Sequence, residues 1–296
     1  PVMTANAPAS PTFQTPASTS ANAVNAASSV IPRPTGLRIQ GRQTILRSAR
    51  SEWIKFWTLR STWITSFIAI ALTVLFGAGL AASLGQSEEY QDKAMNLITS
   101  GLTFGQIVVA VLGALIITGE YSSGQIRSSL AAVPRRGRLL LSKAVVLSVS
   151  SFLLGSVSIF LSWAISKPFL GEHAGSLTDS HYFGHIWGSG LVFVGIALMT
   201  LGLGFLLRST AGAITMIVSL LFVADLPLQM MSQKWEWAGK LMECLPRSVA
   251  AALSDLSINW SDGAHFLTQG QAIAIFAAWA IIPLIVAWFV FTRRDA

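Results

Sequence analysis

Charged residues and cysteines are scarce in this chain of 296 residues. Only 11% of the residues are charged, and Cys244 is the single cysteine. One cysteine excludes an intrachain disulfide, a four-cysteine zinc site and a cysteine-held iron–sulfur cluster. The low charge content excludes an ordinary soluble domain, in which about a quarter of the residues are charged.

Catalytic and nucleotide-binding motifs are also missing. The chain has no phosphate-binding loop of the Walker type, no His-Glu-x-x-His and no Gly-x-Ser-x-Gly. We therefore expect no catalytic residue, no metal and no cofactor in this chain, which is not an enzyme by itself. An energy-driven membrane machine built on it would take its hydrolysis from a partner.

Hydrophobic residues make up 52% of the chain, and its mean hydropathy is +0.59. A bilayer core needs about 17 to 25 apolar residues per helix. Six stretches meet this requirement, at about 63–82, 102–118, 144–165, 186–207, 211–228 and 271–291. The fourth and fifth are separated only by 208–210, which predicts a tight helical hairpin. The sequence therefore predicts an all-α integral membrane protein with six transmembrane helices.

Basic residues are distributed unevenly along the chain. There are 20 Lys and Arg against 13 Asp and Glu, a net charge of +7. Fifteen of the basic residues fall before the first span, in alternate loops and after the last span. Cytoplasmic segments carry such an excess, so we expect a multi-pass protein of the cell membrane with both termini in the cytoplasm. No single soluble face gathers the basic residues, so no nucleic-acid partner is expected.

The chain before the first span divides into two parts. Residues 1–40 are rich in Ala, Ser, Thr and Pro without a hydrophobic period, which predicts a disordered cytoplasmic tail. Residues 41–62 predict an amphipathic elbow helix, with Trp53, Phe56 and Trp57 on one face and basic residues opposite. Such a helix suits a membrane interface, although packing on a soluble domain is the alternative. The transmembrane domain then covers 63–296.

Small residues form stripes in two of the predicted spans. The stripe of the third span consists of Ser148, Ser151, Gly155, Ser158 and Ser162, and that of the fourth consists of Gly188, Gly195 and Gly202. Small residues let helices approach closely. Close helix packing and a translocation path are both compatible with these stripes.

Two further candidates are polar residues near the external side. Asp225 is an ionisable residue inside the fifth span, where a carboxylate is a candidate for a translocation or gating role. Its position beside Pro227 also suits an interfacial or helix-ending role. His181 and His185 have a spacing found in metal sites, but no third ligand is evident and the segment reads equally well as an aromatic belt.

The segment between Ile117 and Lys143 is a short basic insert between two spans. Ser122 and Gln125 have the spacing of a capping box, an apolar stripe follows at Ile126, Leu130 and Val133, and Pro134 ends the segment. These features predict a short helix with an apolar ridge, flanked by arginines. Composition alone favours two roles equally. The insert could dock on another protein, or its arginines could set the membrane orientation or contact anionic lipid.

The elbow helix, the sequence GEYSSGQIRSSLAAVPRRGRLLLSKA after the second span and the six spans together resemble the permease subunit of a type-2 ATP-binding-cassette (ABC) exporter, particularly actinobacterial ones. The resemblance runs from about Ile45 to the end. It implies that the insert is a coupling helix that docks on a cytoplasmic ATPase. The residues assigned to this role are Glu120, Tyr121, Ser123, Gly124, Gln125, Ile126, Arg127, Leu130, Arg135 and Arg136. Gln125 stands where many relatives have Thr.

The same resemblance implies the working assembly and its cargo. A pair of short external helices is expected at Leu241–Leu256, broken by Pro246. Two permease subunits, identical or different, would combine with two ATPase subunits that bind ATP and Mg. The complex would export a hydrophobic or amphipathic substrate, such as a drug, antimicrobial peptide or lipid, as in multidrug efflux. The alternative is a secondary transporter or channel without an ATPase.

Overall fold

The computed structural model describes residues 44–84, 87, 94–176, 180–255, 260 and 265–293. All regular elements in these ranges are helices. The predicted tail at 1–40 and the first three residues of the predicted elbow segment lie outside the described residues. The prediction of a disordered tail is therefore not addressed by the structure.

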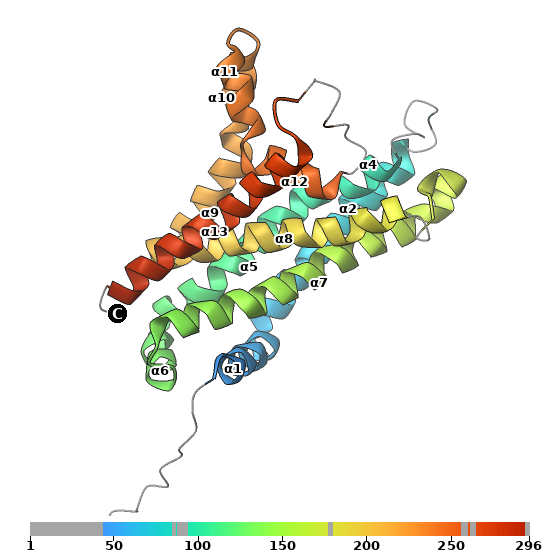
Figure 1. The fold of residues 1–296 in the computed structure, drawn as a ribbon. Coiled ribbons are helices and arrows are strands. Elements are labelled where there is room, and N and C mark those ends of the chain that lie inside the picture. Colours follow the sequence, from blue (N-terminus) through green and yellow to red (C-terminus); the bar gives the residue numbers. More distant parts are fainter. Residues whose placement is uncertain are drawn as a thin grey trace, which may run out of the picture. The chain divides into compact units, whose positions relative to one another are not determined.

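Six helical segments are long and apolar enough to cross a membrane, as expected. They are α2 (Arg60–Leu84), α4 with α5 (Ala94–Thr99 and Leu102–Ser122), α7 (Arg136–Leu170), α8 (Ser180–Leu207), α9 continuing into α10 (Thr210–Val218 and Asp225–Ser232), and α13 (Gln269–Arg293). Helices α2, α5, α7, α8 and α13 lie side by side, whereas α10 projects away from them (Figure 1). The predicted all-α integral membrane fold is confirmed.

Helix α8 lies at the centre of the bundle. It packs against α7, α5 and α13, and its residues Phe193, Ile196 and Leu201 are fully buried. In contrast, α2 and α13 expose large apolar side chains such as Phe67 and Ile282. Exposed apolar faces of this kind are suited to contact with lipid. Helix α8 is therefore the central helix, and the other spans lie between it and the lipid.

The small-residue stripes lie at helix contacts. A Cβ added to Gly155 would lie 2.8 Å from the backbone of Ser189 and Gly190 on α8. A Cβ added to Gly202 would lie 2.7 Å from the backbone of Pro283 on α13. The stripes therefore permit close approach of α7, α8 and α13, which favours helix packing over a translocation path at these positions.

The two ends of the bundle carry different short helices. The amphipathic helix α1 (Ile45–Thr58) and the short helix α6 (Gln125–Ala132) lie at one end, while α10, α11 (Glu236–Glu243) and α12 (Pro246–Ser254) lie at the other (Figure 1). A one-turn 3-10 helix, η1 (Gly171–Ala174), follows α7. A pair of short helices before the last span is present as α11 and α12, but α11 begins at Glu236, before the expected start at Leu241.

The break between α11 and α12 has a local cause. Pro246 occupies the first turn of α12, where its missing N–H removes no helical hydrogen bond. Helix α12 then packs on α8 and α13 through the buried residues Val249, Ala250 and Ala252. Helix α12 is too short to span a bilayer, and this packing fixes it to the end of the bundle.

Candidate functional site

Helix α6 begins at a glycine with a left-handed backbone. Gly124 has φ +71°, a conformation that glycine adopts without steric cost, and it directly precedes Gln125. The predicted capping box is wrong, because no side chain caps α6 and the hydroxyls of Ser122 and Ser123 instead donate to the carbonyl of Gly119 at 3.1 and 2.7 Å. The left-handed glycine turns the chain between α5 and α6, so Ser122 remains in the last turn of α5. Helix α6 ends at Ala132, so Val133 of the predicted stripe is the residue after the helix, and Pro134 follows it as the expected stop.

The apolar stripe of α6 faces the membrane domain. Ile126 is 6% exposed, and Leu130 and Val133 pack against the main core. The interpretation of this stripe as the docking ridge of the insert is therefore wrong, because hydrophobic packing uses it to fix α6 to the bundle. The exposed residues of the insert include Arg127 and Arg135, together with Ala131, Ala132 and Pro134, while the exposed Gln125 and Ser128 also line a cavity.

The arginines that flank α6 have different environments. Arg127 and Arg135 are exposed, whereas Arg136 is the first residue of α7. The Arg136 guanidinium donates to the carbonyl of Phe291 at 3.1 Å and lies over its ring. Arg136 therefore joins α7 to the last turn of α13, while Arg127 and Arg135 remain available to a partner.

The turn between α8 and α9 lies at the same end of the bundle. Arg208 has φ +52°, and Ser209 caps α9 by accepting a hydrogen bond from the N–H of Gly212 at 3.2 Å. The Arg208 guanidinium lies 5.2 Å from the ring centroid of Tyr121, at the end of α5. The predicted tight hairpin is present, and it contacts the residue next to Glu120.

The aromatic residues of α1 are only partly on one face. Phe56 is buried, whereas Trp57 is 41% exposed and stacks edge-on against Trp63 at a centroid distance of 4.8 Å. Trp53 is half-buried and packs near Trp57. The predicted elbow helix is present at Ile45–Thr58, with exposed aromatic rings that suit a membrane interface.

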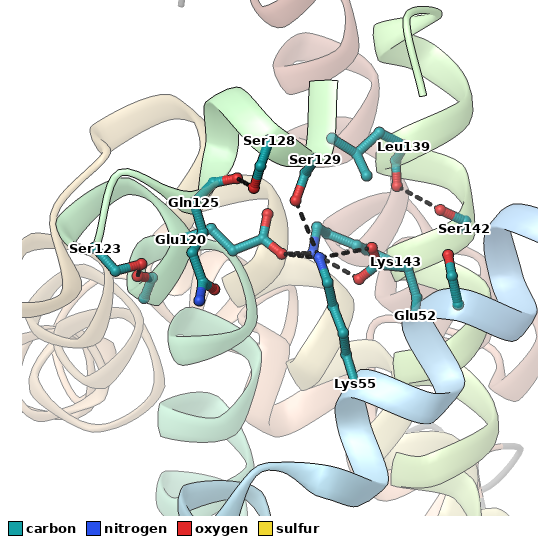
Figure 2. Close-up of polar contacts among 12 residues, drawn as sticks. Glu52, Lys55, Glu120, Ser123, Gln125, Ser128, Ser129, Leu139, Ser142 and Lys143 are labelled. Atoms are coloured by element: carbon teal, nitrogen blue, oxygen red, sulfur yellow. Dashed lines mark hydrogen bonds and ion pairs between the residues drawn. The ribbon is translucent and has the colours of Figure 1, made fainter. Parts of the chain in front are cut away.

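Four charged side chains from three helices meet beside α6 (Figure 2). The Lys143 ammonium donates to Glu52 Oε2 and to Glu120 Oε1, each at 2.7 Å. The Lys55 ammonium donates to Glu120 Oε1 at 2.8 Å, to Glu52 Oε1 at 3.4 Å and to the hydroxyl of Ser129 on α6 at 3.0 Å. This charge cluster, Glu52, Lys55, Glu120 and Lys143, joins α1, α5 and α7, and Lys55 extends it to α6.

Three of the four members of the charge cluster are buried, so each of these charges needs the others as counter-charges. Lys143 is 2% exposed, and Glu52 and Glu120 are almost as buried. Burial by itself would lower the pKa of Lys55, but the hydrogen bond to Glu120 and the attraction of both carboxylates outweigh it and raise that pKa above its usual value. A charge removed from this cluster would leave another buried without a partner.

The sequence interpretation did not find the charge cluster. Of its four members, only Glu120 has an assigned role in the sequence, in the coupling region. Two signals were present: Glu52 lies one helical turn from both Ala49 and Phe56, on the apolar side, and Lys143 follows three leucines. Isolated charges in apolar surroundings indicate buried pairing.

A cavity of about 500 Å³ adjoins the charge cluster. Its walls come from α1, α2, α5, α6 and α7, and include Glu52, Lys55, Glu120 and Lys143 together with apolar residues of α5. A second, apolar groove of about 280 Å³ lies between α2 and α7 and shares Phe56 and Thr62 with the cavity. Ligand sites in proteins typically combine such an apolar wall with a few polar groups.

The candidates at the other end of the bundle are tied to helix packing. Asp225 Oδ2 lies 3.6 Å from a guanidinium nitrogen of Arg247 on α12, directly after the π-helical turn Ser219–Val223. His185 Nδ1 lies 2.6 Å from the carbonyl of Ser254, also on α12. The His181 side chain lies outside the described residues. Within the described part of the chain, no group of three or more potential metal ligands occurs.

The six spans, with an amphipathic helix and a short interhelical helix at one end, define a polytopic membrane protein. A family model described as ABC-2 family transporter protein matches residues 46–296. The chain therefore belongs to the ABC-2 transporter family and is a membrane component of an ABC transporter. None of the curated proteins that were compared matched the chain.

Proposed function

We propose that this chain is the permease subunit of an ABC exporter, driven by ATP hydrolysis in a partner ATPase. The observation that carries this proposal is α6, whose apolar residues pack into the bundle while Arg127 is exposed. A helix that is fixed to the bundle and has polar residues on its exposed face can transmit force from a bound protein to the spans. The ATPase would bind ATP and Mg, and the permease would contribute no catalytic group.

The orientation belongs to the same proposal. The end of the bundle that carries α1 and α6 also carries Arg136 and Arg208, which contact Phe291 and Tyr121. An excess of Lys and Arg marks the cytoplasmic side of membrane proteins. We infer that this end faces the cytoplasm, that both termini lie there and that α11 and α12 are external. A working complex would contain two permease and two ATPase subunits.

Export of a hydrophobic or amphipathic molecule is the transport activity that we propose. ATP-driven changes at α6 would shift the permease between inward-facing and outward-facing states, which must differ in affinity for the cargo. Drugs, antimicrobial peptides and lipids share the required apolar character. The apolar cavity wall beside the charge cluster supports such a cargo.

Co-purification with an ATPase tests the proposal against its alternative. A secondary transporter or channel would work without a motor. The permease and the cognate ATPase should co-purify in equal amounts, and the permease should stimulate ATP hydrolysis in lipid vesicles. Absence of any ATPase from an active, transporting preparation would favour a secondary transporter or channel.

A further inference from the structure

The cavity beside the charge cluster holds a buried carboxylate that is incompletely bonded. Glu120 Oε1 accepts hydrogen bonds from both Lys55 and Lys143. Glu120 Oε2 is also buried but has no hydrogen-bond partner among the described residues. A carboxylate oxygen can accept two hydrogen bonds, and a buried acceptor without any is costly. Glu120, which lines the cavity, therefore keeps one unused acceptor oxygen.

The two lysines of the charge cluster differ in exposure. The Lys143 side chain is 1% exposed and is held by two carboxylates, whereas the Lys55 side chain is 42% exposed. Lys55 lies at the wall of the cavity and can extend into water because its stem is long and flexible. Its departure would leave Glu52 and Glu120 with only Lys143, a net charge of −1 in the cluster.

This charge arrangement selects the sign of a ligand. An anion would approach Glu52 and Glu120, whose repulsion is offset only by lysines that are already paired. A primary ammonium group has three N–H donors, so in the place of the Lys55 ammonium it would bind Glu120 Oε1 and can direct a further donor to Oε2. Replacement of one ammonium by another conserves the charge of the cluster.

The adjoining groove indicates which kind of group is attached to the ammonium of the ligand. It shares Phe56 and Thr62 with the cavity and is lined mainly by apolar side chains, among them Trp63, Phe67 and Leu153. A single apolar tail attached to the ammonium group would lie along it. This groove accounts for one tail, which favours a single-chain ligand over a two-chain phospholipid.

We propose that the cavity formed by α1, α2, α5, α6 and α7 binds a single-tailed amphipathic amine, with Lys55 as its built-in competitor. The ammonium group binds Glu120 in place of Lys55, and the tail enters the groove beside Phe56. The further claim that such an amine is the exported cargo rests on the proposed export function. Binding to the isolated permease requires no ATPase, so the two proposals fail separately.

The test is a titration of the full chain in phosphatidylcholine nanodiscs with decylamine, decanol and decanoate, corrected for empty discs. Decylamine should bind more tightly than decanol or decanoate. Lys55→Met should bind decylamine about tenfold more tightly and decanol unchanged, because one charge-assisted contact no longer competes. This gain of affinity cannot arise from misfolding. Arg50→Met, which removes an exposed positive charge from the same helix, is the matched control and should bind as wild type does.

Three results would overturn the amine site. The first is equal affinity for the three decyl compounds, and the second is an unchanged decylamine affinity in Lys55→Met. The third is displacement of decylamine by phosphatidylethanolamine, which would make a membrane lipid the occupant. Glu120→Gln should abolish the preference for decylamine over decanol in protein that still elutes as a single species. If the wild-type permease binds decylamine but shows no ATP-driven transport with its ATPase, the export function alone would be overturned.

Discussion

Lys143 Nζ lies 2.7 Å from Glu52 Oε2, although the two residues are 91 positions apart and both are buried. This ion pair connects the amphipathic helix α1 to the first turns of α7. The second carboxylate on Lys143 comes from Glu120, directly before the turn into α6. The position of α1 and the start of α6 therefore depend on one buried ammonium group.

Lys143→Met should be strongly destabilising. It would leave Glu52 and Glu120 buried with only the half-exposed Lys55 as a counter-charge, at an expected cost of about 3–5 kcal/mol. The measurement is the unfolding midpoint of the purified protein in mild detergent. The matched control is Glu52→Gln with Glu120→Gln and Lys143→Met together, which removes all three buried charges and should recover most of the loss. A triple variant less stable than Lys143→Met would refute this account of the cluster.

The raised pKa of Lys55 predicts a specific alkaline sensitivity. The folded protein holds this proton more tightly than the unfolded chain, whose Lys55 titrates near 10.5. The stabilisation is complete below that pH and is lost as the pH rises through the higher pKa of the folded state. Above pH 10.5 the stability of the wild type should therefore approach that of Lys55→Met. Parallel stability curves for the two proteins across this range would contradict the assignment.

Gly155 and Gly79 provide a matched test of helix packing. Gly155→Ala should cost about 1–3 kcal/mol, because its Cβ would meet the backbone of α8 at 2.8 Å. Gly79 lies in α2 with no atom within 4 Å of an added Cβ, so Gly79→Ala should be neutral or stabilising by up to about 1 kcal/mol. Thermal unfolding in detergent measures both. Equal effects at the two sites would show that close approach is not what Gly155 provides.

Asp225→Asn tests whether the ion pair with Arg247 is structural. The pair joins the end of the π-helical turn to α12, and Arg247 is 46% exposed. A partly exposed pair contributes about 1 kcal/mol or less, so Asp225→Asn should lower stability slightly and leave transport unchanged. Loss of transport in a variant with normal stability would instead support a translocation or gating role for Asp225.

The hydropathy pattern was sufficient to predict the six spans, because burial in lipid imposes long apolar helices. The short α6 was predicted by its local stripe and Pro134. The orientation of α6 was not, because the direction in which Ile126 points depends on the turn at Gly124 and on which helices lie nearby. Helix α7 also begins earlier than the expected span, so Arg136 and Lys143 are helical rather than in a loop.

The charge cluster lay outside what the sequence could predict. Its members come from α1, α5 and α7, and no local pattern specifies that Glu52 meets Lys143. Helix packing determines which helix faces which, and it depends on close contacts such as Gly155 with Gly190. The docking role of α6 remains a prediction, which rests on the exposure of Arg127 and on the family.

The most direct test of the proposed function is ATP hydrolysis by the cognate ATPase in lipid vesicles with the wild-type permease or with Arg127→Glu. Reversal of an exposed charge on α6 should weaken ATPase binding about tenfold or more and remove its stimulation, while the permease still inserts and stays folded. Arg50→Glu, on the exposed face of α1, is the matched control and should retain stimulation. Full stimulation by Arg127→Glu would contradict docking at α6.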